Sequence, residues 1–336
     1  MKTKYFNLIL LSILSIFITG CINELEFNGD MTQPYMVMNG YVTPDSVVKV
    51  HLTKSKFFLQ SDDNFNYVSN ATVKLYVNGI EKQTMTYIKN GFYISTYMPM
   101  VGDIIKVVAS NSEFENVNST IEVIDPTIIL SVDSSNHVYE KNVMTSYSSY
   151  NGGAYIIDTI GYSINEQCDF KVKFKDPAGK TNFYRVSLKL INYFENDSIS
   201  IQIPYMYSDD LVFTNGQEAT DIIGGGGYGS SYHEFSDELF NGKEYGLKIS
   251  YSLYSNYYSG EEYKQYNQNG KLPEKRELFI TLNSISKAYY LYLKTRAASS
   301  NEMEFFSEPV QIHSNITGGL GILGSYSGSN YKFNME

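Results

Sequence analysis

Ser284-Ile285-Ser286-Lys287 is the stretch whose residue types come nearest to a nucleophile and its base, because Ser-x-x-Lys is the nucleophile box of penicillin-recognising enzymes. Those enzymes also carry an SDN element and a KTG strand, and this sequence has neither. It also lacks the Gly-x-Ser-x-Gly elbow of the α/β-hydrolases. We therefore interpret the stretch as a helix cap followed by the first helical turn, and we predict no catalytic serine.

The residues that could hold a metal are dispersed. The four histidines are His51, His137, His233 and His313. No two of them stand at a metal-binding spacing, and neither Asp62-Asp63 nor Asp209-Asp210 begins an EF-hand loop. We interpret His233-Glu234, the most site-like pair, as a surface pair and not as two ligands. The sequence thus predicts no metal and no cofactor, although a glycosidase-like carboxylate pair stays open among 36 acidic residues.

The glycine run Gly224-Gly225-Gly226-Gly227-Tyr228-Gly229 suggests a phosphate cradle at first sight. A P-loop needs Gly-Lys-Ser/Thr at a fixed spacing between a strand and a helix, and neither condition is met. We predict a flexible loop or the tip of a hairpin. A role as a mobile lid over a pocket stays open.

Cys21 ends a segment that has the layout of a secretory signal. Two lysines precede an apolar run of 14 residues, which is shorter than the roughly 20 residues that a membrane-spanning helix needs. Ile18-Thr19-Gly20-Cys21 then resembles the lipobox of bacterial lipoproteins. We predict removal of residues 1–20 and acylation of the Cys21 thiol, followed by a polar tether over residues 21–34. An ordinary signal peptide that is cut elsewhere is the alternative.

Cys168 is the only other cysteine, so an acylated Cys21 leaves it without a partner for an intrachain disulfide. Cys168, Phe170, Val172 and Phe174 alternate with lysines at 171, 173 and 175. This period of two is typical of a strand with one apolar face, so we predict a buried, unreactive thiol.

The charge balance excludes one class of partner. The formal charge is −10, and removing residues 1–20 with Lys2 and Lys4 makes it −12. The sequence has no cluster of Lys and Arg, whereas nucleic-acid affinity depends on cations that neutralise phosphate. We therefore predict no nucleic-acid partner, and attachment to the membrane through lipid alone.

The aromatic residues are 31 Tyr and 19 Phe, with no Trp. Tyrosine is typical both of half-buried strands and of binding surfaces, so its abundance does not choose between them. The densest segment runs from Tyr251 to Tyr266. Beyond the alternating part we predict a loop whose exposed tyrosines are the candidate ligand-binding residues: Tyr257, Tyr258, Tyr263 and Tyr266. Packing, or a clamp within the loop, is the alternative.

Alternation of apolar and polar residues predicts an all-β protein. Over residues 35–125, seven short strands are separated by turns, including Asn78-Gly79 and Asn90-Gly91. This spacing is typical of an immunoglobulin-like or transthyretin-like β-sandwich. Asp125-Pro126 is the predicted boundary with a second, larger β-rich domain over residues 126–336, folded as a sandwich or in a barrel-like way.

The second domain has an irregular start and one helix. Residues 133–154 are rich in Ser, Asn, Tyr and Gly, and predict a functional loop or disorder. Strands are predicted around 155–164, 170–174, 184–190, 245–253 and 278–282. A helix with Ser284 as its cap follows, because Ile285, Ala288 and Tyr289 begin a helical spacing. The segment 308–324 predicts a strand, a glycine loop and a closing strand.

Several phrases together resemble the domain of unknown function 4249 family of bacterial outer-membrane lipoproteins. They are Asn39-Gly40, Asn70–Val73, Lys173–Pro177, Asn182–Arg185, Phe235–Asp237, Phe240–Lys243, Ser307–Val310, Ser314–Ile316 and Gly318–Gly321. The resemblance spans nearly the whole mature chain. It implies an outer-membrane lipoprotein of a diderm bacterium and suggests work beside a TonB-dependent transporter. The family has no agreed activity, so the resemblance assigns no catalytic residue.

These observations favour a lipid-anchored, non-enzymatic binding or accessory protein of the outer membrane, with a TonB-dependent transporter as the expected partner. A surface module that binds glycans or peptides on its own is the alternative, although the absence of Trp disfavours sugar stacking. A hydrolase is the third hypothesis. The leaflet that the protein faces is left open.

Overall fold

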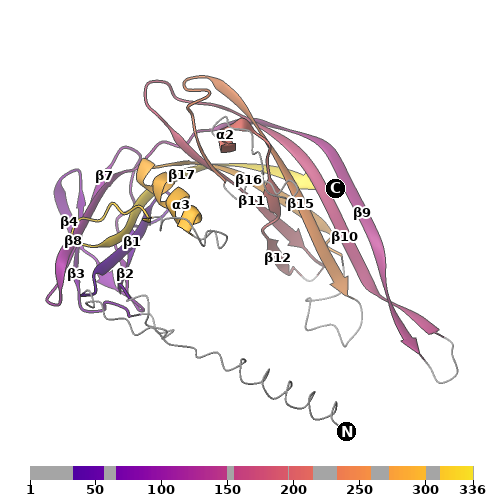
Figure 1. Ribbon diagram of the computed structural model, residues 1–336, viewed down its shortest axis with the longest axis horizontal. Helices are drawn as coiled ribbons and strands as arrows, with labels where there is room; N and C mark the ends of the chain where they lie inside the picture. The colour runs from indigo at the N-terminus through magenta and orange to yellow at the C-terminus, as the bar shows by residue number, and fades with distance from the viewer. Residues whose placement is uncertain are drawn as a thin grey trace, which may run out of the picture. The chain divides into compact units, whose positions relative to one another are not determined.

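The computed structural model describes residues 33–56, 66–149, 155–195, 197–214, 233–258, 272–299 and 311–335. Strands dominate these ranges, which hold two helices, α2 (Leu211–Thr214) and α3 (Lys287–Ser299). The prediction of an all-β fold is therefore confirmed (Figure 1). From Tyr35 on, the described residues other than Lys56 belong to one compact unit.

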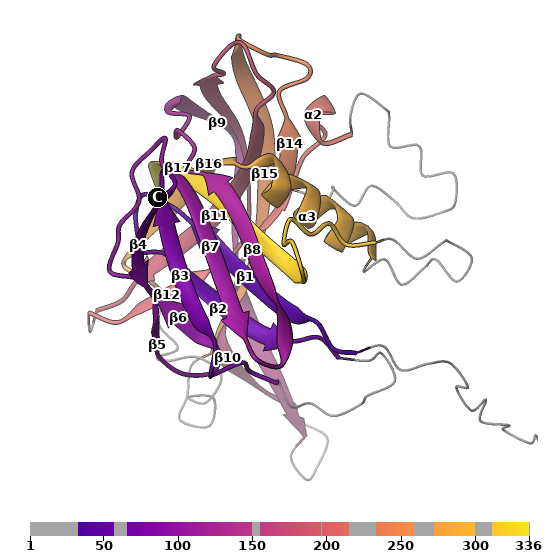
Figure 2. The same cartoon turned by 90° about the vertical axis from the view of Figure 1, so that its left-hand side faces the viewer.

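The strands up to residue 122 contribute to two facing sheets. One is a four-stranded sheet in the order β4-β3-β7-β8, made of β4 (Ile80–Thr84), β3 (Thr72–Val77), β7 (Ile104–Asn111) and β8 (Phe114–Glu122). Asn78 and Gly79 join β3 to β4 with φ angles of 51° and 83°, the signature of a type I′ hairpin turn. Figure 2 shows the strands of this part of the chain. Met38 and Leu52 of the facing sheet share one apolar core with Leu75 and Val107 of this sheet.

The facing sheet has nine strands and continues far beyond residue 125. Its order is β12-β11-β16-β17-β1-β2-β6-β5, with β14 (Glu234–Ser236) added to β11. The strands are β12 (Ile199–Gln202), β11 (Phe183–Tyr193), β16 (Lys275–Ile285), β17 (Leu320–Met335), β1 (Met36–Val42), β2 (Lys49–Lys54), β6 (Phe92–Ile94) and β5 (Thr86–Tyr87). β1 and β17 pair in parallel, with Val37 opposite Leu320 and Val42 opposite Ser325. One hydrogen-bonded sheet thus serves both sides of Asp125-Pro126, and the domain boundary there stays a prediction.

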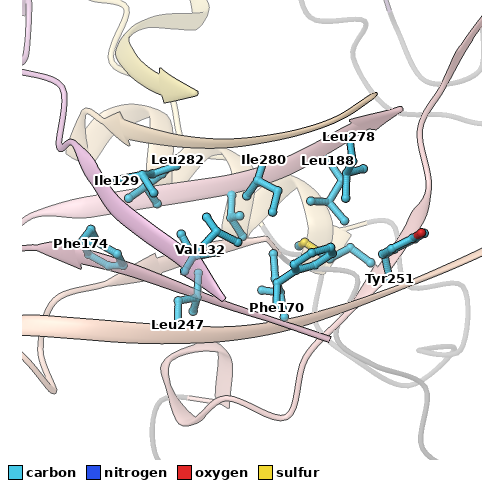
Figure 3. Packing of buried hydrophobic residues seen from close by; sticks show 14 of the residues in the cluster. Ile129, Val132, Phe170, Phe174, Leu188, Leu247, Tyr251, Leu278, Ile280 and Leu282 are labelled. Carbon is cyan, nitrogen blue, oxygen red and sulfur yellow. The ribbon is translucent and has the colours of Figure 1, made fainter. Parts of the chain in front are cut away.

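A third sheet covers the C-terminal half of the nine-stranded one. Its order is β13-β15-β10-β9, from β13 (Tyr205–Tyr207), β15 (Glu244–Tyr258), β10 (Tyr155–Lys175) and β9 (Ile129–Ser149). Cys168, Phe170, Val172 and Phe174 are buried as predicted, and they meet side chains such as Leu188 and Ile280 of the opposite sheet (Figure 3). Burial raises the pKa of the Cys168 thiol to about 11, in agreement with an unreactive cysteine.

The predicted loop at 133–154 is wrong as far as residue 149, because β9 extends through it as one strand of a long hairpin. β9 is an edge strand, and nearly all its side chains from Asp133 to Met144 are exposed. A strand with two wet faces shows no alternation, and three register shifts against β10 blur the pattern further. Residues 150–154 lie outside the described residues.

The helix begins two residues later than predicted. Ser284 lies in β16, and Ser286 is the cap, because its Oγ accepts a hydrogen bond from the Tyr289 backbone N–H at 3.4 Å. The predicted glycine loop is also shorter, since β17 already begins at Leu320. Gly321 has a φ of +111°, and a Cβ there would collide with the Met38 carbonyl. The strand predicted around residues 308–312 is not one at 311 and 312, and 308–310 lie outside the described residues.

Candidate functional site

The predicted site residues fall into two groups. Cys21, Tyr263, Tyr266 and the glycine run 224–229 lie outside the described residues, so lipid attachment and the lid stay predictions. Tyr257 and Tyr258 lie in β15, opposite Tyr162 and Gly161, and the loop predicted for them is wrong. The Tyr257 side chain is only 7% exposed, and this burial raises its pKa. The sequence left ligand binding and packing as alternatives for these tyrosines, and Tyr257 is a packed side chain.

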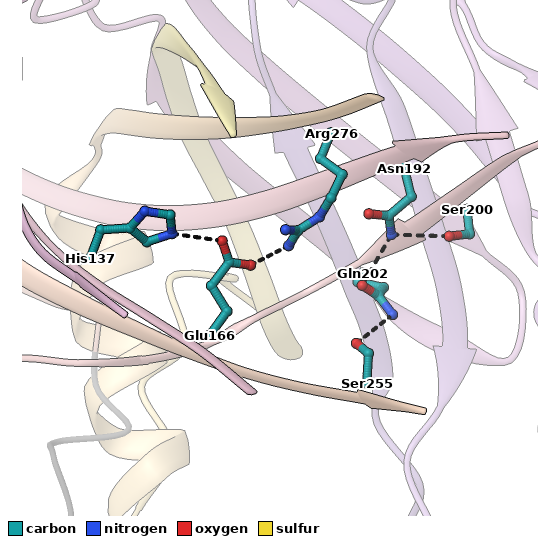
Figure 4. Close-up of polar contacts among 7 residues, drawn as sticks. All are labelled: His137, Glu166, Asn192, Ser200, Gln202, Ser255 and Arg276. Atoms are coloured by element: carbon teal, nitrogen blue, oxygen red, sulfur yellow. Dashed lines mark hydrogen bonds and ion pairs between the residues drawn. The ribbon is translucent and has the colours of Figure 1, made fainter. Parts of the chain in front are cut away.

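Glu166, Arg276 and His137 form a polar cluster that runs from the core of the sandwich to its surface, and no sequence motif predicted it (Figure 4). Glu166 of β10 is fully buried and pairs with Arg276 of β16, while His137 Nε2 of β9 lies 2.9 Å from Glu166 Oε1. Burial opposes the charge on Arg276, but the hydrogen bond and charge of Glu166 outweigh it and raise the Arg276 pKa. One carboxylate thus connects three strands of two facing sheets.

A second polar cluster adjoins the first through Asn192, which is the cross-strand partner of both Arg276 and Ser200. Asn192 Nδ2 donates to Ser200 Oγ at 3.1 Å and to Gln202 Oε1 at 3.0 Å. Gln202 Nε2 in turn donates to Ser255 Oγ of β15 at 3.3 Å (Figure 4). This end of the sandwich is therefore held by polar contacts between its two sheets.

The arrangement of these two clusters is structural in kind. Glu166 has no exposed surface, and its two oxygens are committed to Arg276 and His137. The neighbouring Tyr251 hydroxyl has its pKa raised, first by burial and then by the charge of Glu166. Such groups hold a register between sheets and bind ordered water, because buried polar atoms require partners. Within the first cluster, His137 is the member that reaches the surface, with 40% of its side chain exposed.

The family-like phrases meet at the opposite end of the same sandwich, around two buried carboxylates. Asp176 accepts hydrogen bonds from the Tyr184 hydroxyl, from Asn182 Nδ2 at 3.2 Å and from the Gly242 N–H at 2.7 Å. Asp237 Oδ2 accepts the Asn182 N–H at 2.9 Å and Asn241 Nδ2 at 2.9 Å. Burial and the nearby Asp176 raise the pKa of Asp237, although its bonds to Asn182 oppose the shift.

Aromatic rings fill the space beneath these carboxylates. Phe174 lies 5.4 Å from Tyr184 and 5.6 Å from Phe240 between ring centroids, and Phe240 stacks on Tyr245 at 4.3 Å. Offset and edge-on pairs of this kind add about 0.5–1.5 kcal/mol each beyond their buried area. The phrases around residues 173–177, 182–185, 235–237 and 240–243 therefore build one hydrogen-bonded, aromatic-filled corner.

His233-Glu234 is not the surface pair that the sequence suggested. Glu234 is buried in β14, where Arg185 Nε lies 3.1 Å from its carboxylate, and Arg185 also donates to the Tyr289 hydroxyl of α3 at 3.0 Å. Burial, and then the charge of Arg185, lower the pKa of His233. These contacts attach α3 to the sheet. They were missed because the pairing of β14 with β11 has no signal in the sequence.

An open groove of about 670 Å³ lies against the family-like corner. Pro177 and Phe183 line one part of it, Ile121 and Ile124 another, and Ala288, Tyr290 and Leu291 of α3 a third. The Phe183 and Tyr290 rings lie 4.6 Å apart between centroids. Polar and charged side chains also line it: Glu122, Asp125, Lys180, Thr181, Asn182, Glu238 and Lys287.

The groove contains the Ser284–Lys287 stretch but not the geometry of a nucleophile. The Ser284 hydroxyl donates to Thr127 Oγ1 at 3.1 Å and accepts the Thr127 N–H at 3.0 Å. Among the described residues, no lysine, histidine or carboxylate is hydrogen-bonded to Ser284, and the serine lies in a strand rather than at the start of a helix. Its observed role is to tie β16 to the segment before β9.

A second hollow of about 580 Å³ lies on the outer side of the third sheet. Its lining includes two carboxylate residues, Asp169 and Asp209, and two lysines, Lys171 and Lys248, which are cross-strand partners. In the part of the chain that the structure describes, no group of three or more His, Cys, Asp and Glu residues could hold a metal ion. No helix in that part is both long enough and apolar enough to cross a membrane.

Comparison with known families gives one decisive match. The model of the family described as a domain of unknown function (DUF4249) matches residues 22–332. The chain belongs to this family. The match extends from the first strands of the N-terminal sandwich, through the buried carboxylate corner, to most of β17, as the phrases had suggested. No curated protein matches the chain.

Among solved structures, the chain is similar to a protein from Corynebacterium diphtheriae that is described as membrane anchored. The two share 12% identity with a TM-score of 0.21, over 76% of this chain and 55% of that one. The chain thus spans about half the length of that protein. At this level of similarity we base no argument on it.

Proposed function

We propose that this DUF4249 protein is a lipid-anchored, non-enzymatic binding or accessory protein of the outer membrane that works beside a TonB-dependent transporter. The observation that carries the proposal is the groove of about 670 Å³. Its wall is the corner built by the family-like phrases, and its floor mixes aromatic, aliphatic and polar side chains as binding sites do. The lipobox at Cys21 supports the anchor, and the resemblance supports the transporter.

Co-purification tests this proposal. We expect the tagged full-length chain, extracted from membranes with mild detergent, to bring a TonB-dependent transporter with it. Ala288→Arg, which places a long cation in the groove, should lower the recovery of the transporter at least about tenfold. Ala298→Arg is the matched control, because Ala298 is half-buried in the same helix but does not line the groove.

Repeated recovery of the intact chain without any transporter would contradict the proposal. Equal recovery of the transporter with both arginine variants would support the transporter as partner but would show that the groove does not bind it. The melting temperatures of both variants are measured first, so that unfolding is not mistaken for lost binding.

A surface module that binds glycans or peptides on its own is the second candidate. The neighbouring Phe183 and Tyr290 rings, with Asn182 and Thr181 in the same groove, favour it, because such a combination suits a sugar face or an extended peptide. Calorimetry of the full chain with a panel of polysaccharides and peptides distinguishes it from the first. Heat that disappears in Ala288→Arg but not in Ala298→Arg would support it, and no heat with any ligand would remove it.

A further inference from the structure

One side of the C-terminal sandwich is closed by a single extended segment, residues 199–207. Its first part is β12, the terminal strand of the nine-stranded sheet, and its second part is β13, the terminal strand of the sheet that faces it. The chain passes from one sheet to the other at Ile203-Pro204. In the described part of the chain no strand pairs with the outer edge of β12.

In β12 the polar side chains face the interior of the sandwich and the apolar side chains face solvent, which is the reverse of the usual arrangement. Ser200 and Gln202 are the half-buried ones and bond to Asn192 and Ser255 inside the sandwich. Ile199, Ile201 and Ile203 are 52%, 58% and 74% exposed. A shift of one residue would bury all three isoleucines, so the observed register holds a row of apolar side chains against water.

The protein protects its other sheet edges. Exposed edges invite pairing with a second chain, and proteins blunt them with charged residues or by keeping them short. β4, β8 and β9 carry charged side chains: Glu81, Lys82, Glu115, Glu122, Asp133, Glu140 and Lys141. β5 has only two residues. β12 and β13, with the sequences ISIQ and YMY, have no charge. Among the terminal strands of the three described sheets, an uncharged edge longer than two residues therefore occurs only within residues 199–207.

We propose that the outer edge of β12 pairs antiparallel with the same edge of a second copy of this chain, about a two-fold axis at Ile201. The sequence from Ile199 to Ile203 is its own complement in this pairing. Ile201 meets Ile201 of the other copy, Ile199 meets Ile203, and Ser200 meets Gln202. Apolar side chains thus lie opposite apolar ones, and a two-fold axis needs such a self-complementary surface.

Charge also favours a second copy in this register. The nearest charged residue along the chain is Asp197, which is exposed and lies in the turn before β12 with a φ of 54°, so no carboxylate belongs to the paired residues 199–203. The contact is small beside the roughly 800 Å² per partner of a standard interface, so we expect a weak dimer. The inference goes beyond the proposed function, because it requires neither a transporter nor a ligand.

Cysteine cross-linking in living cells tests the register. Directly opposed side chains have Cβ atoms about 4.5–5.5 Å apart, near the range that a disulfide spans. Full-length Ile201→Cys should give a disulfide-linked dimer after mild oxidation. Ile199→Cys alone should not, because the two cysteines would lie four residues, or about 13 Å, apart along the strands. The double variant Ile199→Cys/Ile203→Cys should restore the dimer.

Val143→Cys is the matched control, because Val143 is equally exposed at 58% on the charged edge strand β9. The native Cys168 is buried and contributes no background. A second measurement needs no cysteine: Ile201→Lys opposes two ammonium groups and should lower the dimer fraction of the purified chain at least about tenfold. Val143→Lys should leave it unchanged.

Three results would overturn the proposal. In the first, no dimer forms with Ile201→Cys. In the second, Val143→Cys or Ile199→Cys cross-links as well as Ile201→Cys, which indicates random collision. In the third, position 201 cross-links only to a different polypeptide, which would show that the edge receives a strand from another protein. Each of these outcomes leaves co-purification with a transporter untouched, so the two proposals fail separately.

Discussion

Glu166 and Arg276 occupy positions where the alternation of their own strands calls for apolar side chains. Glu166 shares the inward face of β10 with Cys168 and Phe170, and Arg276 shares the inward face of β16 with Leu278. This parity is the one signal in the sequence that could have found the cluster. A charge on the buried face of a strand requires a partner, although the sequence does not say which of many charges it is.

Removing one member of the Glu166–Arg276 pair should be costly. Arg276→Met leaves a buried carboxylate whose remaining partner is His137, and we expect a loss of about 3–5 kcal/mol in the free energy of unfolding. Replacing both, as Glu166→Leu with Arg276→Met, should restore most of it, because an apolar pair needs no charge compensation. Urea unfolding of the three chains measures both effects. A loss below about 1 kcal/mol in the single variant would show that water reaches Glu166.

Glu277, the next residue along β16, points to the opposite face of the sheet and holds a different kind of contact. Its carboxylate bonds to Lys275 at 2.8 Å, to the Tyr193 hydroxyl at 2.7 Å and to Lys332 at 3.2 Å. These hydrogen bonds, with Lys275 first, lower the pKa of Glu277 from 4.5 to about 2. A carboxyl whose pKa is depressed by folding stabilises the folded state above its unfolded pKa, and the stabilisation is lost as the pH falls to its folded pKa.

Glu277→Gln should therefore be less stable than the unmodified chain at pH 7, and the difference should shrink between about pH 4.5 and pH 2. Urea midpoints across this range measure it. Glu115→Gln, an exposed change on β8, is the control and should show little difference at any pH. A gap between Glu277→Gln and the unmodified chain that stays constant down to pH 2 would contradict the assignment.

At the scale of elements, strands with one solvent-exposed face and one buried face could be predicted from the sequence. Strands exposed on both faces could not. β2, β3, β10 and β15 show a period of two, and Asn78-Gly79 and Asn90-Gly91 turn as predicted, with positive φ at all four residues. β9 was missed because neither of its faces is buried over most of its length. Tyr257 was assigned to a loop because the pairing of β15 with β10 extends past the apolar part of the strand.

The candidate groove could not be predicted from the sequence either, although several of the segments that form it were noticed there. Asn182–Arg185 and Phe235–Asp237 stood out as phrases, yet their meeting depends on hydrogen bonds between residues 55 apart, such as Asn182 to Asp237. The predicted start of the helix was wrong for a local reason. Ser284 and Ser286 are both good caps by residue type, and only the length of β16 decides between them.

A substitution at Gly321 tests whether β17 must lie as close to β1 as it does. Gly321→Ala adds a Cβ that collides with the Met38 carbonyl and strains a φ of +111°. Gly79→Ala has a similar φ problem, at +83°, but its Cβ meets nothing within 4 Å. We expect Gly79→Ala to cost about 1–2 kcal/mol from the backbone alone, and Gly321→Ala to cost clearly more. Thermal unfolding compares them, and equal losses would show that β17 can move away from β1 at little cost.

At the scale of the whole molecule, the proposed attachment to the envelope depends on one side chain. Cys21→Ser should release the exported chain into the soluble fraction, because no other means of attachment is predicted for an acidic chain without a basic cluster. Cys168→Ser is the control and should stay with the membranes. Mass spectrometry of the N-terminal peptide should find acyl chains on Cys21. An unmodified thiol there, with soluble protein, would contradict the anchor.

The parallel pairing of β1 with β17 has a consequence for how the chain folds as it is synthesised. Residues 36–42 are synthesised early, but their partner in β17 arrives only with residues 320–325. Until then the backbone groups of β1 on that side have no partner strand. The predicted export of the chain in an unfolded state suits this architecture, because the sheet closes only when the late segment arrives. We expect a nascent chain interrupted before β17 to depend on periplasmic chaperones or to be degraded.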